Sequence, residues 1–141
     1  EVRPCLKCMD GCGRIFHGLP ARCAVNPEMG YETEVRLLQP AKEVKKALVI
    51  GGGPAGMQAA QTLRARGHEV VLCEKDSRLG GKLHDAGCVS FKHLMRGYRD
   101  YMIRATERCG ARILLNTEVT EAFVKEQHPD VVFVAVSFPS T

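Results

Sequence analysis

Four cysteines near the N-terminus have a spacing that could hold a metal centre. They form the pattern Cys-x2-Cys-x3-Cys-x10-Cys and are Cys5, Cys8, Cys12 and Cys23. The two short gaps allow one tight loop to present three thiolates to a single centre, and neighbouring glycines and prolines let the backbone wrap around it. We expect the fourth thiolate to follow a short helical turn around residues 14–16.

Four thiolates suit either a cubane iron–sulfur cluster or a tetrahedral zinc ion. The spacing favours the cluster, because structural zinc sites usually pair two Cys-x2-Cys turns, whereas here three cysteines crowd together and the fourth is remote. Zinc and unligated thiols are the alternatives. His17 lies between the third and fourth cysteines, and we interpret it as a helix-end or surface residue.

A second segment has residues suited to binding a diphosphate. The apolar run 47–50 ends in the pattern Gly-x-Gly-x-x-Gly, written Gly51-Gly52-Gly53-Pro54-Ala55-Gly56. Gly51 permits the tight turn, Gly53 lets the backbone approach a pyrophosphate, and Gly56 lets the following helix pack on the strand. The free N–H groups at the start of a helix over 54–66 attract the anion.

Context further along the chain supports a dinucleotide site. Gly67 is a suitable helix cap, and a strand over 69–73 delivers Glu74 about 20 residues after the glycine pattern. A carboxylate there can accept hydrogen bonds from an adenosine ribose. Lys75 follows it, and Gly80-Gly81-Lys82 forms a second glycine turn. The alternatives are a solvated strand end for Glu74 and a plain surface turn for the second glycine pair.

Taken together, the two motifs resemble the middle of the iron–sulfur flavoenzymes related to old yellow enzyme. These include 2,4-dienoyl-CoA reductase, trimethylamine dehydrogenase, 2-enoate reductase and clostridial NADH oxidases. The resemblance covers nearly the whole chain and rests on Cys5-x2-Cys8-x3-Cys12, on Arg14-Ile15-Phe16-x-Gly18-x-Pro20-x-x-Cys23-x-Val25-Asn26-Pro27, and on residues 46–56. The combination is much more specific than either motif alone.

The resemblance implies an enzyme of three parts. An N-terminal barrel holds FMN and substrate, the four cysteines ligate a 4Fe-4S cluster, and the following region binds FAD, or only ADP, together with NAD(P)H. The implied partners are thus an FMN barrel and a further nucleotide domain of the same polypeptide. The expected metal ligands are Cys5, Cys8, Cys12 and Cys23, and the expected cofactor-binding residues are Gly51, Gly53, Pro54, Ala55, Gly56, Glu74, Lys75, Gly81 and Lys82.

The last apolar segment departs from the family. Relatives usually continue it into Ala-Thr-Gly, where small residues let the backbone close over the dinucleotide. This chain instead has Ala135-Val136-Ser137-Phe138-Pro139. Valine and serine do not copy a closely approached glycine, so whether FAD or only ADP binds is open at this point.

The remaining pattern predicts an α/β fold, namely a Rossmann-like FAD/NAD(P)-binding parallel sheet preceded by the cysteine-rich iron–sulfur segment. We expect a helix over 91–108, capped by Ser90 and ended by Gly110, with Tyr98 and Tyr101 on its core stripe. Strands are expected over 113–115, 119–124 and 131–136, and the unbroken apolar run predicts that the last is buried. We expect helices on both faces of the sheet. Cys73, Cys88 and Cys109 have no partner at ligand spacing.

Composition limits the classes of function. The net charge of +4 is scattered without a basic block, which argues against nucleic acid, and no apolar run reaches the roughly 18 residues of a membrane span. The odd number of cysteines and the missing signal peptide favour a reducing cytoplasm. We expect a cluster segment over 1–30, a polar connector over 31–46 and an incomplete nucleotide domain over 47–141.

These expectations give a leading hypothesis for function. The chain is predicted to be the electron-transfer segment of a flavin-dependent NAD(P)H oxidoreductase, cut from a longer polypeptide and catalytically incomplete alone. One alternative is a non-catalytic nucleotide-binding remnant that holds zinc or no metal. Another is a fragment of a reductase like the glutamate synthase small subunit, whose cysteine spacing matches less well.

Overall fold

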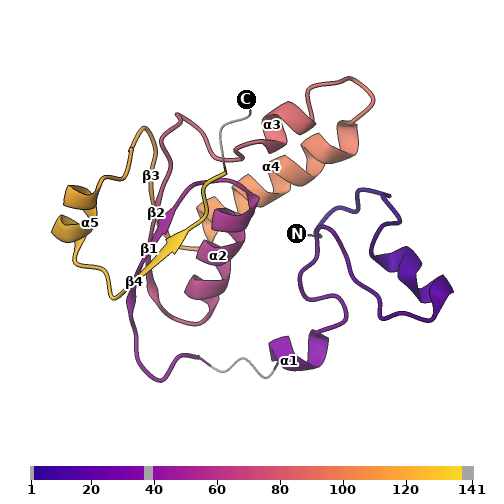
Figure 1. Ribbon diagram of the computed structural model, residues 1–141, viewed down its shortest axis with the longest axis horizontal. Helices are drawn as coiled ribbons and strands as arrows, with labels where there is room; N and C mark the ends of the chain where they lie inside the picture. Colours follow the sequence, from indigo (N-terminus) through magenta and orange to yellow (C-terminus); the bar gives the residue numbers. More distant parts are fainter. Residues whose placement is uncertain (1, 37–39, 138–141) are drawn as a thin grey trace.

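The computed structural model describes residues 2–36 and 40–137, and these contain a four-stranded parallel sheet (Figure 1). The strands lie in the order β3-β2-β1-β4. They are β1 (Lys46–Ile50), β2 (Glu69–Cys73), β3 (Arg112–Leu114) and β4 (Val131–Val134). Every neighbouring pair runs parallel. The predicted α/β fold with a Rossmann-like parallel sheet is therefore confirmed.

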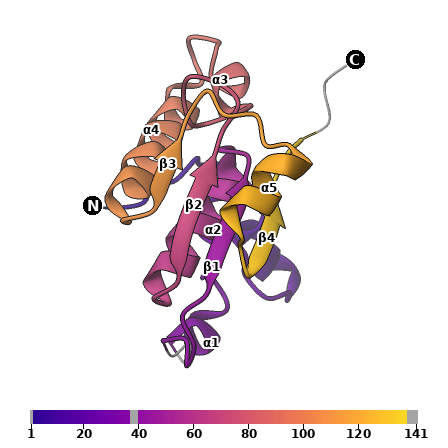
Figure 2. The same cartoon turned by 90° about the vertical axis from the view of Figure 1, so that its left-hand side faces the viewer.

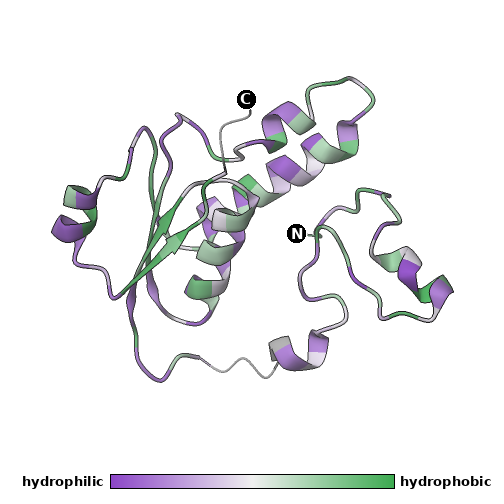
Figure 3. Cartoon of the chain, in the orientation of Figure 1, coloured by the Kyte–Doolittle hydropathy of each residue, from purple (hydrophilic) through white to green (hydrophobic). Residues whose placement is uncertain are grey.

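Strand β1 lies at the centre of the core. It pairs with β2 on one side and β4 on the other, and Ala47, Leu48 and Val49 are all buried. A parallel strand covered on both faces needs apolar side chains at successive positions, which explains the continuous run that precedes the glycine pattern. Figure 3 shows the same apolar character along the central strands.

Helices cover both faces of the sheet. The helices are α2 (Pro54–Ala65), α3 (Leu83–Ala86), α4 (His93–Arg108) and α5 (Glu121–Gln127). Figures 1 and 2 show α2 and α4 on one side of the strands and the short α5 on the other. A buried hydroxyl joins α2 to α4, because Thr106 Oγ1 accepts from Gln61 Nε2 at 2.9 Å and donates to the Met102 carbonyl oxygen at 2.7 Å.

The expected strand over 119–124 is wrong, because this part of the chain begins helix α5. The Thr120 side chain accepts a hydrogen bond from the Phe123 N–H at 3.2 Å, which is the geometry of a helix N-cap. Glu121 and Lys125 then form an ion pair one turn apart, at 2.7 Å. Local capping and charge pairing therefore outweigh the short apolar stretch.

The expected burial of the last strand is also wrong. β4 covers residues 131–134 and pairs with only β1 among the described residues. Val132 and Phe133 are each 37% exposed and Val134 is 70% exposed. The apolar run matches a parallel strand, but an edge position leaves its side chains accessible. Phe138 and Pro139 lie outside the described residues.

The long helix begins later than expected. α4 starts at His93, and its cap residue Lys92 makes no side-chain capping bond, so Ser90 is not the cap. Phe91 is 76% exposed and lies outside the core stripe. Tyr98 is buried and Tyr101 packs against the core, as expected. Gly110 follows the helix end with φ of 84°, a conformation that favours glycine.

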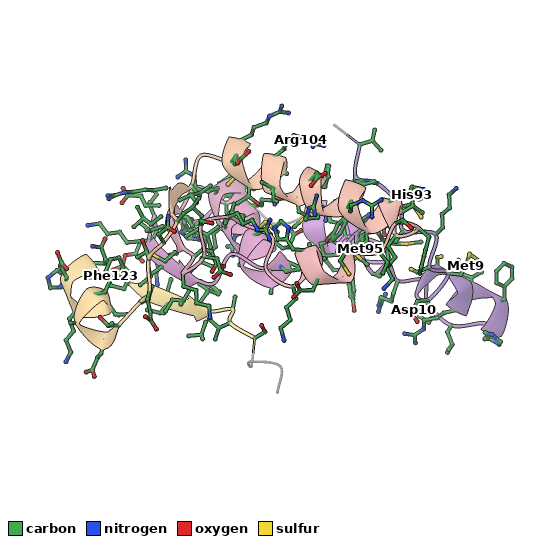
Figure 4. All side chains as sticks on the ribbon, turned by 90° about the horizontal axis from the view of Figure 1, so that it is seen from above. Met9, Asp10, His93, Met95, Arg104 and Phe123 are labelled. Carbon is green, nitrogen blue, oxygen red and sulfur yellow. The ribbon has the colours of Figure 1, made fainter. Side chains whose placement is uncertain are left out.

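The cysteine segment packs against the nucleotide fold. It contains the short helix η1 (Cys12–His17), which confirms the expected helical turn, and it is followed by α1 (Glu32–Arg36). Val25 is 6% exposed within the core, and Leu6 and Cys23 pack against that core. Figure 4 shows Met9 and Asp10 of this segment at one end of the molecule and Phe123 of α5 at the other.

Within the described ranges, every helix is too short or too polar to cross a membrane.

We expect Met102→Ala to lower the free energy of unfolding by about 2–5 kcal/mol, because this fully buried side chain would leave a cavity between α4 and the core. Urea unfolding of wild type and variant measures the difference. Met95→Ala, on the same helix but only half-buried, is the matched control and should cost less. Equal losses at the two positions would contradict the assigned core.

Candidate nucleotide and metal sites

Gly51 turns the chain out of β1 and contacts the end of β4. Its φ is 105°, and its N–H donates to the Cys73 carbonyl oxygen at 2.8 Å. A Cβ atom there would lie 2.6 Å from the carbonyl oxygen of Ala135. Both the backbone conformation and the packing therefore require glycine.

The other two glycines of the pattern have different surroundings. A Cβ at Gly56 would overlap the carbonyl oxygen of Gly51, whereas a Cβ at Gly53 would meet nothing within 4 Å. Gly56 is thus required for packing, and the space beside Gly53 is open. Pro54 is the first residue of α2, and both it and Ala55 are exposed. The open side of the loop therefore faces the start of a helix, where a phosphate is attracted.

Glu74 is buried at the end of β2, with an exposed fraction of 7%. One carboxylate oxygen, Oε2, accepts from the Gly52 N–H at 2.6 Å, and the other, Oε1, accepts from the Asp76 N–H at 2.9 Å. The Glu74 side chain therefore holds the glycine loop, residues 51–53, against the end of β2. Each oxygen keeps further acceptor capacity, so the expected bond to a ribose stays a prediction.

Sequence reasoning missed Gly52, which it treated as a variable position of the pattern. A Cβ there would lie 2.6 Å from Leu79 Cδ2 and 3.0 Å from Glu74 Oε2. The signal was present in the sequence, because three successive glycines stand where the pattern needs only two. Gly52 therefore packs closely where the glycine loop meets the segment after β2, and a larger residue there would have to displace the Leu79 and Glu74 side chains.

The second glycine turn lies against the first. The Gly80 N–H donates to the Gly52 carbonyl oxygen at 2.9 Å, and a Cβ at Gly81 would lie 3.1 Å from Gly53 Cα. Both Gly80 and Gly81 have positive φ. The structure thus brings Gly81 to the predicted phosphate loop. Lys82 follows it, and Lys82 and Lys75 are both exposed.

A groove of about 540 Å³ lies beside this region, between α4 and β3. It is lined by Ser77, Arg78, Leu79, His84, Ile103, Glu107, Ile113 and Leu115. None of the predicted cofactor-binding residues lines it, so the groove adjoins the predicted site without forming part of it.

The cysteine loop has a tightly turned backbone. Lys7 and Met9 both have φ of 55°, and the Lys7 N–H donates to Cys5 Sγ at 3.2 Å. Backbone N–H bonds to sulfur are a feature that tunes iron–sulfur clusters. Cys5 and Cys8 are exposed, and Cys12 and Cys23 are half-buried.

A close backbone contact aligns the two ends of the longest cysteine gap. The Arg22 N–H donates to the Gly11 carbonyl oxygen at 3.2 Å, and a Cβ at Gly11 would lie 2.5 Å from the Arg22 carbonyl oxygen. Cys12 and Cys23 are the next residues on the two segments. The contact therefore places the third and fourth cysteines on adjacent stretches of backbone.

Among the described residues, no three His, Cys, Asp or Glu side chains gather closely enough to hold a single metal ion. The donor set of the predicted metal centre is therefore four thiols on a turned loop, with one N–H bond to sulfur and two backbone segments in contact.

The other cysteines have different environments. Cys73 is buried at the end of β2, and burial raises the pKa of its thiol, against a smaller lowering by the Arg112 charge. A buried thiol of raised pKa stays protonated and unreactive. Cys88 is exposed and Cys109 half-buried.

Comparison with known proteins identifies relatives that match most of the chain. The family model described as pyridine nucleotide-disulphide oxidoreductase matches residues 45–133, more than half of the chain. The chain is 39% identical over 137 residues to the NADH oxidase of Thermoanaerobacter brockii, covering 96% of this chain and 21% of that protein. It is 40% identical over 143 residues to the cinnamate reductase of Clostridium sporogenes, covering 100% of this chain and 21% of that protein.

Solved structures include similar regions. A 2-naphthoyl-CoA reductase in complex with 2-naphthoyl-CoA superposes with a TM-score of 0.86 at 32% identity, covering 93% of this chain and 20% of that one. The histamine dehydrogenase of Rhizobium sp. 4-9 superposes with a TM-score of 0.77 at 25% identity, covering 95% and 20%. The chain thus spans about a fifth of the length of the relatives it matches.

We expect Gly53→Ala to leave the melting temperature unchanged while weakening ADP binding at least tenfold. The added methyl group meets no protein atom within 4 Å but enters the space that a pyrophosphate requires. Calorimetric titration with ADP and a thermal melt measure the two effects.

The matched control is Gly56→Ala, which should destabilise the fold itself by about 1–3 kcal/mol through overlap with the Gly51 carbonyl. ADP binding by Gly53→Ala at the wild-type affinity would exclude a pyrophosphate from this side of the loop.

Proposed function

This chain belongs to the pyridine nucleotide-disulphide oxidoreductase family, and on that premise we propose that it is the electron-transfer segment of a flavin-dependent NAD(P)H oxidoreductase. Its similarity to an NADH oxidase and a cinnamate reductase confirms the resemblance that the two sequence motifs predict. The family implies a binding site for FAD or NAD(P). The 4Fe-4S cluster, the choice between FAD and ADP, and the FMN of a larger enzyme are parts of the proposal.

One observation carries the proposal, namely that the four-cysteine segment packs on the helix that begins at the phosphate loop. Val25, two residues after Cys23, shares the buried core with Met57 of α2 and Tyr98 of α4. The N-terminus of α2 carries the free N–H groups of the predicted nucleotide site. A cluster and a nucleotide would therefore be held by one packed unit, as electron transfer between two cofactors requires.

The residues have distinct roles in this proposal. Cys5, Cys8, Cys12 and Cys23 hold the cluster, which would supply one-electron transfer when bound. Gly53 leaves room for the pyrophosphate, with Pro54, Ala55 and Gly56 in the first turn of α2, and Gly81 lines the far side of the loop. Glu74 keeps the glycine loop in shape and offers its spare lone pairs to the ribose. Lys75 and Lys82 provide positive charge near the phosphates.

The proposal extends to the larger enzyme. We infer that residues 1–30 form the cluster segment, 31–46 the connector and 47–141 part of the nucleotide domain. An FMN barrel and a second nucleotide domain would supply the substrate and NAD(P)H sites. A reducing, cytoplasmic setting would keep the seven cysteines free of disulfides.

We expect the anaerobically reconstituted chain to be brown and to contain about four iron and four sulfide per chain. Cys8→Ser should lose the cluster, because it removes a thiolate from the turned loop. Iron, sulfide and zinc analysis with an absorption spectrum measures the outcome.

Cys88→Ser is the matched control, since Cys88 is exposed like Cys8 but lies outside the segment, and it should keep the full iron content. Stoichiometric zinc without sulfide would favour the nucleotide-binding remnant instead.

We expect Val136→Thr combined with Ser137→Gly to raise FAD affinity severalfold while changing ADP affinity little. Val136 lies beside the glycine loop, with its Cγ1 atom 3.4 Å from the position of a Cβ at Gly51, and its side chain is 63% exposed. Glycine at position 137, which has no side chain, would let the backbone close over the flavin half of the ligand, and threonine at position 136 restores the residue that relatives have there. Calorimetric titration with FAD and ADP separates the two ligands, and an unchanged ratio of affinities would show that this segment does not contact the flavin.

A further inference from the structure

Arg3 joins the cysteine segment to both helices on which it rests. Its Nη1 donates to the Val25 carbonyl oxygen at 2.7 Å and to Gln58 Oε1 of α2 at 3.1 Å. Its guanidinium carbon lies 5.5 Å from the centre of the Tyr101 ring of α4, a cation–π distance. One side chain near the start of the chain thus contacts three separate parts of the fold.

The bond to Val25 has a special position relative to the cysteines. Arg3 is two residues before Cys5, and Val25 is two residues after Cys23. The hydrogen bond between them therefore closes the whole four-cysteine segment into a loop. Closing a loop at its ends limits the conformations available to everything inside it.

The surroundings of Arg3 make the contact strong. Val25 is 6% exposed and Tyr98 8% exposed, so the guanidinium lies at the edge of the buried core. Burial raises the pKa of the Tyr98 hydroxyl, and the Arg3 charge opposes that rise, so the guanidinium acts on Tyr98 as well as on Tyr101. Hydrogen bonds from a charged donor in such a place are stronger than neutral ones.

We propose that Arg3 is a positioning residue that closes the four-cysteine segment and fastens it to α2 and α4. It thereby holds the first and last thiolates in place and keeps a positive charge near the metal centre. The docking contacts are all made within the protein, whereas the effect on a 4Fe-4S cluster rests on the function proposed above.

The first experiment measures docking alone, by hydrogen exchange of the metal-free chain. In Arg3→Gln, the amides of the non-proline residues in 5–25 should exchange at least tenfold faster than in wild type, because the charged hydrogen bonds and the cation–π contact are lost. Arg14→Gln is the matched control, since Arg14 is an exposed arginine of the same segment, and it should exchange like wild type. Unchanged exchange in Arg3→Gln would overturn the proposal.

The second experiment measures the effect on the cluster in the anaerobically reconstituted chain. Arg3→Gln should bind at least twofold less iron and sulfide, and the reduction potential of its remaining cluster should shift to more negative values, because reduction adds negative charge that Arg3 no longer offsets. Arg3→Lys, which keeps the cation, should retain the wild-type potential even if it binds less iron. Arg14→Gln should match wild type in both readouts.

The outcomes distinguish the two proposals. A wild-type chain that takes up no iron and sulfide would defeat the proposed function, while the exchange data would still decide the docking role of Arg3. A wild-type chain that loads normally, with Arg3→Gln equal to it in iron content and potential, would overturn the positioning of the thiolates. If circular dichroism shows that Arg3→Gln does not fold, Arg3→Lys replaces it in the exchange experiment. We then expect faster hydrogen exchange than in wild type, and exchange at the wild-type rate would count against the proposal.

Discussion

Close contact between backbone segments at the ends of β1 and β2 is the constraint on which the predicted nucleotide site depends. The Gly52 N–H donates to the Glu74 carboxylate, and the Gly52 carbonyl accepts from the Gly80 N–H. A Cβ at Gly51 or Gly52 would collide with neighbouring atoms, whereas a Cβ at Gly53 would not. The loops that follow β1, β2 and β4 therefore meet where little room is left for side chains, and the open side of the loop at Gly53 is the one that a pyrophosphate would approach.

The cysteine segment uses the same physical device. Gly11 allows the backbone before Cys12 to touch the backbone before Cys23, through the bond between Arg22 and Gly11. Because glycine has no side chain, two backbone segments that are distant in sequence can lie directly against each other here. Both predicted sites therefore owe their shape to glycines at close backbone contacts. Both also contact α2, because the glycine loop leads into the start of this helix and the cysteine segment packs along its side.

Local patterns predicted the glycine loop and the elements beside it, because strand, turn and helix signals there agree with one another. Prediction was wrong where a short signal competed with another, as at residues 119–124, where the Thr120 cap and the Glu121–Lys125 pair favour a helix. The exposure of β4 depends on its place at the sheet edge, which no local pattern encodes. Contacts across long sequence separations, such as Arg3 to Gln58 or Glu74 to Gly52, were likewise not visible in the sequence.

The two hydrogen bonds of the Glu74 carboxylate affect how a nucleotide would bind. Its two oxygens accept N–H bonds from Gly52 and Asp76, so contacts within the protein hold the loop in shape. A ribose hydroxyl would then use the remaining lone pairs rather than replace these bonds. A loop that is held by its own contacts loses less of the interaction energy to entropy when a ligand binds. A carboxylate expected to act only as a ligand group therefore also holds the backbone donors of the predicted site in place.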